Sequence, residues 1–191
     1  MPEAVQMIPM TQRAIRTLTL SLGLVISAGL AQAQDDEVST NIVDAMQDWG
    51  VHESTDPRQC WAVSTFTESV NTFEDGRLRA VSRGNILLMV FYRPAENIAG
   101  QVAFTGGYPF APGSFVDVEI GGNTYQMFTE GEWAWPTSEA EDAKIIAAMK
   151  RGADAVLTAR SSRDTITKDT FSLLGFTAAV EEAETRCAED G

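Results

Sequence analysis

Histidine, cysteine and basic side chains are scarce in this sequence of 191 residues. It contains one histidine, two cysteines and 14 lysines and arginines against 27 acidic residues, which gives a formal net charge of −13. A surface of this charge repels phosphate backbones and anionic lipid headgroups, so nucleic-acid binding is not expected. We favour a simple reason for this acidity, which is that the charge keeps the protein soluble.

The single histidine restricts the chemistry that the chain can perform. Imidazole is the usual general base and metal ligand at neutral pH, and His52 is the only one. No Gly-x-Ser-x-Gly elbow, calcium loop or phosphate loop accompanies it. The sequence therefore predicts no catalytic residue, no metal site and no cofactor, and we expect a protein that is not an enzyme.

One long uncharged run lies near the start of the sequence. Arg13 and Arg16 precede TLTLSLGLVISAGLAQAQ, and its small-x-small ending AQA completes the pattern of a secretory signal peptide over residues 1–33. We predict Sec-type export to the periplasm or the medium, with cleavage between Ala33 and Gln34. The run is shorter than the roughly 20 residues of a comfortable membrane span, so we expect no stable anchor after cleavage.

Export would place the two cysteines where a disulfide can form. In an oxidising compartment Cys60 and Cys187 have one possible intramolecular pairing, whereas two separate buried thiols are the alternative. The close spacing of a catalytic dithiol is absent. A disulfide closing so long a loop contributes on the order of 5 kcal/mol in the chain-entropy model.

The fold class follows from residues 81–136, where short apolar runs alternate with Gly, Pro and Asn. This spacing is typical of adjacent strands joined by tight turns. The nearly continuous apolar run at 86–92 predicts a central strand buried on both faces. We expect a single, mainly β domain over residues 48–191, an antiparallel β-sandwich or flattened barrel with two packed helices. Residues 34–47 form an acidic lead-in, partly disordered or a short helix.

Both helices lie in the C-terminal part of the sequence. Thr137 or Ser138 can cap the first, which stops at Gly152. The second begins near Phe176 and follows a helical spacing of apolar residues that places Cys187 on its buried face. The disulfide would then join the first clear strand of the sheet to the last helix.

Acids and large aromatics come together at one turn. Glu130 and Glu132 flank Gly131 beside Trp133 and Trp135, a combination that sugar-binding surfaces use. We favour the simpler interpretation that both indoles pack on the core. The alternative is a glycan-binding module or an envelope enzyme built on these four residues. With the turn at 106–113, the candidate binding surface comprises Tyr108, Phe110, Glu130, Glu132, Trp133 and Trp135.

A second polar segment spans residues 161–170. It is rich in hydroxyl groups and carries Arg163 and Lys168, two of the few basic residues. A small-anion or partner site is one interpretation. A polar turn followed by a Thr-rich strand is the other, and we favour it.

Several segments in this order resemble the invasion-associated locus B family of exported α-proteobacterial proteins. They are DWGV at 48–51, CWAV at 60–63, NILLMVFYRP at 85–94, FTEGEWAWP at 128–136 and TFSLLGFTAA at 170–179. The resemblance implies an exported, β-rich, non-enzymatic protein, linked in pathogens to host-cell entry. It leads us to expect an accessory protein that binds a protein or another envelope component.

The chain departs from the family pattern at one position. Family members often carry a cysteine shortly after the Trp-x-Val element, where this sequence has Glu53. The local pairing that the pattern implies cannot form here, which leaves Cys60 with Cys187.

Overall fold

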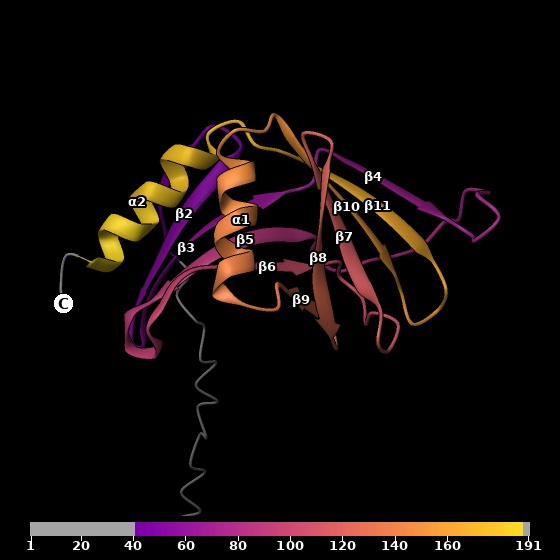
Figure 1. Cartoon of the computed structure of the whole chain (residues 1–191), viewed down its shortest axis with the longest axis horizontal. Helices are drawn as coiled ribbons and strands as arrows, with labels where there is room; N and C mark the ends of the chain where they lie inside the picture. Colours follow the sequence, from indigo (N-terminus) through magenta and orange to yellow (C-terminus); the bar gives the residue numbers. More distant parts are fainter. Residues whose placement is uncertain (1–40, 189–191) are drawn as a thin grey trace, which may run out of the picture. The chain divides into compact units, whose positions relative to one another are not determined.

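The computed structural model describes residues 41–188, and Figure 1 shows how their strands and helices are arranged. Within these residues the chain forms strands, two α-helices and one short 3-10 helix. The strands are β1 (Asn41–Met46), β2 (Trp49–Thr55), β3 (Arg58–Thr65), β4 (Glu68–Thr72), β5 (Leu87–Arg93), β6 (Ile98–Thr105), β7 (Phe115–Ile120), β8 (Asn123–Glu130), β9 (Trp133–Trp135), β10 (Asp154–Arg160) and β11 (Ile166–Ser172). The helices are η1 (Pro94–Glu96), α1 (Glu139–Met149) and α2 (Phe176–Ala188).

The described strands form one antiparallel sheet of eleven strands. Their order is β1-β2-β3-β5-β6-β9-β8-β7-β10-β11-β4, and the two ends do not pair with each other. The predicted class, mainly antiparallel β with two packed helices, is confirmed. Its form is a single open sheet, in place of two separate sheets or a closed barrel.

The core lies where the two halves of this sheet turn toward each other. Phe104 of β6 meets Phe171 of β11 with ring centroids 6.1 Å apart, and both rings are fully buried. At the far end the Trp49 indole N–H donates to the Ser172 carbonyl over 2.9 Å. Sandwich-like packing is thus reached by curving one sheet.

Both helices pack on the sheet from the core side (Figure 1). Helix α2 covers β2, β3 and β5, and its Phe176 ring lies 4.8 Å from the Trp49 ring. Helix α1 lies against β6 and buries Ile145 and Met149. Among residues 41–188 no helix has the length and apolarity needed to cross a membrane.

Local predictions fared differently along the chain. The central strand at 86–92 and the helices at 139–149 and 176–188 are confirmed. The short helix expected at 41–47 is wrong, because residues 41–46 pair with β2 as an edge strand. The signal peptide at 1–33 and the first part of the lead-in, 34–40, lie outside the described residues.

Candidate functional site

A break in strand pairing creates a large groove beside β6. Strand β9 pairs with β6 only at Phe104 and Thr105, so the earlier part of β6 has no strand beside it on that side. Helix α1 occupies this position instead. The space between them is about 980 Å³, and residues of β5, η1, β6, β8, β9, α1 and α2 line it.

Asp142 of α1 takes the place of the missing strand at one backbone group. Its Oδ1 accepts the Val102 N–H over 2.7 Å, so this buried donor is satisfied. Asp142 is only 7% exposed, and burial raises its pKa to about 6, against the lowering effect of the Val102 bond and with a smaller raising effect from Glu139. The groove therefore contains a carboxyl group that titrates near neutral pH.

Aromatic side chains form one wall of the groove. Trp135 lines it, and Trp133 stacks beside Trp135 with ring centroids 6.2 Å apart and planes 20° apart. Phe128 on the neighbouring strand lies 5.8 Å from Trp135. Since Trp133 is 37% exposed and only Ala134 between the two indoles is fully buried, the prediction that both indoles pack on the core is wrong. The strand places its one small residue inward and its two large ones outward.

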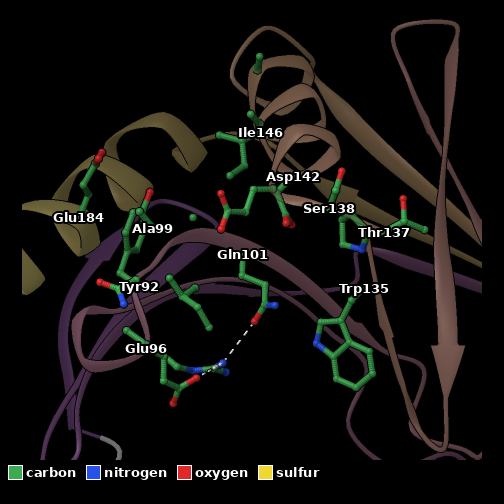
Figure 2. A pocket seen from close by; sticks show the side chains of 18 of the residues that line it. Tyr92, Glu96, Ala99, Gln101, Trp135, Thr137, Ser138, Asp142, Ile146 and Glu184 are labelled. Atoms are coloured by element: carbon green, nitrogen blue, oxygen red, sulfur yellow. Dashed lines mark hydrogen bonds and ion pairs between the residues drawn. The ribbon is translucent and has the colours of Figure 1, made fainter.

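The groove also presents hydrogen-bonding groups at fixed positions (Figure 2). Arg93 donates to the Gln101 side-chain oxygen over 3.2 Å, lies 3.7 Å from the Glu96 carboxylate and stacks over Phe91. Trp135 lies across from Gln101 in Figure 2. An indole in the same groove as a side-chain amide and a guanidinium is a suitable arrangement for a flat, polyhydroxylated ligand.

The six predicted surface residues do not form one surface. Glu130 and Trp135 line the groove, whereas Tyr108 and Glu132 line a second pocket of about 520 Å³. Phe110 is buried at 4% exposure and packs on Tyr108. The Tyr108 hydroxyl bonds Thr167 over 2.6 Å, and burial raises the pKa of this phenol to about 12.

We call the second pocket the arginine pocket, since three guanidinium groups line it together with hydroxyl groups and one carboxylate. Its lining includes Arg79, Arg83, Arg163, Ser161, Ser162 and Glu132. The segment at 161–165, where the polar turn was the favoured interpretation, thus forms part of a concave surface as well as a turn.

His52 lies away from both pockets. Its ring stacks on Trp61 of β3 with centroids 5.3 Å apart and planes 13° apart. Within the described residues no group of three or more His, Cys, Asp or Glu side chains is arranged to hold a metal ion. The expectation of a non-enzymatic protein stays a prediction.

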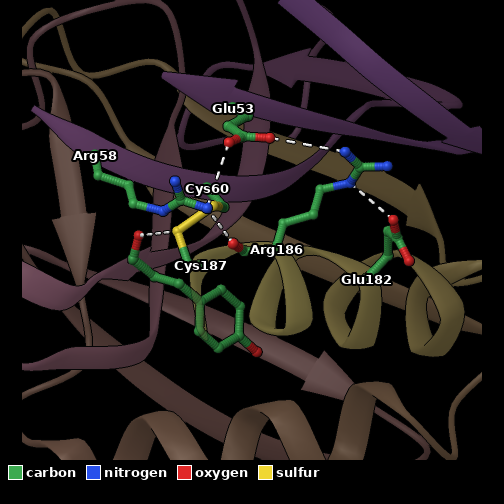
Figure 3. Close-up of a disulfide and its surroundings, with 7 residues drawn as sticks. Glu53, Arg58, Cys60, Glu182, Arg186 and Cys187 are labelled. Carbon is green, nitrogen blue, oxygen red and sulfur yellow. Dashed lines mark hydrogen bonds and ion pairs between the residues drawn. A yellow bond between two sulfur atoms is a disulfide. The ribbon is translucent and has the colours of Figure 1, made fainter. Parts of the chain in front are cut away.

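The disulfide between Cys60 and Cys187 is present, joining β3 to the last turn of α2 across 127 residues (Figure 3). Charged groups reinforce the junction. Glu53 lies 3.6 Å from Arg58 and 3.7 Å from Arg186, and the Arg58 guanidinium donates to the Arg186 carbonyl. Glu53 lies directly opposite Cys60 in the β2–β3 ladder.

Sequence reasoning missed two central residues of these sites. Asp142 sits among Glu139 and Glu141 in the acidic first turn of α1, where helix-end charge explains it sufficiently. Asp169 alternates with polar residues in a Thr-rich strand, yet it is fully buried and pairs with Arg83. Only the three-dimensional pairing distinguishes these acids from the surface ones.

The segment containing the aromatic wall, α1 and the 161–165 loop is similar to a known family. Residues 110–184 match the model of the invasion associated locus B (IalB) protein family. The predicted resemblance to this family is confirmed. The fold of the chain is also similar to the crystal structure of invasion associated protein B from Bartonella henselae, with a TM-score of 0.52, 12% identity, and coverage of 76% of this chain and 98% of that one. No curated protein sequence matches the chain.

Proposed function

We propose that this chain is an exported, non-enzymatic binding protein whose ligand is a glycan of the cell envelope, bound in the groove beside α1. The observation that carries the proposal is the outward-facing indole pair Trp133 and Trp135, of which Trp135 lines a groove of about 980 Å³. Solvent-accessible indoles in a groove are the feature that separates a glycan-binding surface from a core-packing one.

The chemistry of the groove favours a sugar over a polyanion. A pyranose ring offers an apolar face to an indole and hydroxyl groups to side-chain amides and carboxylates. Trp135 supplies the first contact, while Gln101 and Ser138 supply donors and acceptors around it. The acids Glu96, Glu130, Glu139 and Glu184 also line the groove, so they disfavour phosphorylated or acidic ligands there.

Binding to purified peptidoglycan and to oligomers of N-acetylglucosamine tests this function. Intrinsic tryptophan fluorescence should change on titration, because the indoles are the contact groups. Trp135→Ala should weaken binding by about tenfold or more, since a stacked aromatic contributes roughly 1–3 kcal/mol. Phe66→Ala is the control, because Phe66 is an exposed aromatic (40%) that lines neither pocket.

Two results would redirect the proposal. If glycans do not bind but an envelope protein is captured and lost with Trp135→Ala, the groove serves a protein partner. If neither ligand class is affected by Trp135→Ala, the groove is not the site. Export is tested separately by the mature N-terminus, which should be Gln34 in material recovered from the periplasm or medium.

A further inference from the structure

We propose that the arginine pocket is a binding site for a single small oxyanion group, best matched by a phosphate monoester. This site is independent of the glycan groove. It lies between the segment at 79–83, the turn at 107–109 and the loop at 161–165. The argument rests on which of its guanidinium charges the protein itself neutralises.

Arg83 lines the pocket, but its charge is neutralised by Asp169. Its two terminal nitrogens bond the two Asp169 oxygens over 2.8 and 2.6 Å, and its Nε donates to the Gly106 carbonyl over 2.8 Å. The side chains of Arg83 and Asp169 are 7% and 0% exposed. A bidentate buried pair of this kind leaves no charge to offer a ligand.

Arg79 and Arg163 carry the available charge. Among residues 41–188 neither has a carboxylate partner within ion-pair distance, although acidic side chains far outnumber basic ones. Glu132 is the one carboxylate that shares the lining. The accessible groups therefore sum to two positive charges against one negative.

The protein holds the Arg79 side chain and the backbone of the 161–165 loop in place before any ligand arrives. The Arg79 guanidinium stacks over Phe73 at 4.8 Å and donates one N–H to the Arg163 carbonyl over 2.9 Å. Buried Ser161 accepts from the backbone N–H groups of Arg163 at 3.3 Å and Thr165 at 3.1 Å, which fixes the loop. Because this ordering is already present in the free protein, ligand binding costs less conformational entropy.

The local charge of the pocket and the net charge of the protein together indicate the ligand class. Guanidinium groups bind oxyanions through several parallel N–H donors, and the exposed Ser162 hydroxyl adds another. The net charge of −13 repels extended polyanions and anionic membrane surfaces at longer range. A compact ligand with one phosphate group satisfies both conditions.

Amide chemical shifts of the ¹⁵N-labelled protein provide the test. Titration with inorganic phosphate and, separately, with glycerol phosphate should shift the Ser162 and Arg163 amides saturably, while chloride at the same ionic strength should not. Vesicles containing phosphatidylglycerol should leave these signals unchanged. Absence of a saturable shift with both phosphate compounds would overturn the proposal, as would an equal response to chloride.

Three variants give the sign of each contribution. Arg163→Gln should weaken phosphate binding by about tenfold, since Arg163 is exposed and its loss leaves the fold intact. Glu132→Gln should strengthen it, because the one opposing charge is removed. Lys168→Gln is the matched control, an exposed cation of β11 outside the lining. Equal affinities for Arg163→Gln and Lys168→Gln would show general charge attraction in place of a site.

Discussion

The single residue Asp142 has two roles, one in holding α1 to β6 and one in lining the groove. The carboxyl group closes the gap in strand pairing by accepting the Val102 N–H, and it lines the groove from the same position. Its burial sets a cost on its own ionisation. The groove and the stability of the β6–α1 contact should therefore change over the same pH range.

The pH dependence has a definite sign. The folded-state pKa of Asp142, about 6, exceeds the ordinary value of 3.8, so the folded state binds this proton more tightly. Its contribution to stability is full below about pH 4 and is lost as the pH rises through 6. Asp142→Asn keeps an oxygen for Val102 without the charge, so the free energy of unfolding of the variant relative to wild type should increase by roughly 2 kcal/mol between pH 4 and pH 8.

Urea unfolding at the two pH values measures this difference. Glu141→Gln is the control, since it removes a carboxylate from the same helix turn that does not act on the pKa of Asp142. A difference between Asp142→Asn and wild type that is the same at both pH values would show that Asp142 is charged without cost, and the account of its burial would fail.

At the scale of elements, the junction between β11 and α2 depends on one glycine. Gly175 has a φ of +91°, and a Cβ there would lie 1.8 Å from the Met46 carbonyl oxygen of the β1–β2 turn. Gly113 also has a positive φ, +70°, but a Cβ there would meet nothing within 4 Å. The two glycines thus separate backbone strain from steric overlap.

Alanine at each position should have unequal effects. Gly113→Ala should lower the free energy of unfolding by about 1 kcal/mol, the cost of a left-handed alanine. Gly175→Ala should lower it by roughly 3 kcal/mol or more, because overpacking against backbone adds to that strain. Thermal unfolding of both variants measures the difference, and equal effects would mean that the β1–β2 turn moves away without cost.

The elements divide into those that local sequence predicts and those that it does not. The continuous apolar run Ile86–Tyr92 predicted a central strand, because a run of this length is too short for a buried helix. Ser138 with Glu141 predicted the start of α1. Residues 41–46 form a strand through pairing with β2, against a spacing that also fits a helix. Strand β4 (Glu68–Thr72) was missed because it is polar and half-exposed. Its partner β11 lies far from it in the sequence, so no local pattern indicates the pairing.

The candidate sites were less predictable than the elements. The turn at 130–135 drew attention because acids and indoles occur together there, but which face the indoles occupy depends on Ala134 fitting the interior. The groove itself arises because β9 is only three residues long and pairs briefly with β6. No local pattern predicts the unpaired part of β6, since it depends on how α1 packs beside that strand in the folded structure.

At the scale of the whole described chain, the Cys60–Cys187 bond links the first half of the sheet to the end of the last helix. The loop that it closes spans 127 residues, and in the chain-entropy model such a link contributes roughly 5 kcal/mol by restricting the unfolded chain. Ion pairs of Glu53 with Arg58 and Arg186 surround the bond in the folded state. They join α2 to β2 and β3 in the folded state, so we expect these elements to stay together without the covalent link.

Cys60→Ser, combined with Cys187→Ser to avoid a lone thiol, should therefore lower the melting temperature sharply without abolishing the fold. The free energy of unfolding should fall by roughly 3 to 5 kcal/mol. Wild type measured with a reducing agent should match the double variant, because both lack the same bond. An unchanged melting temperature in both would mean that α2 is held by packing of Phe176 and Val180 alone, and the disulfide would then serve another purpose than stability.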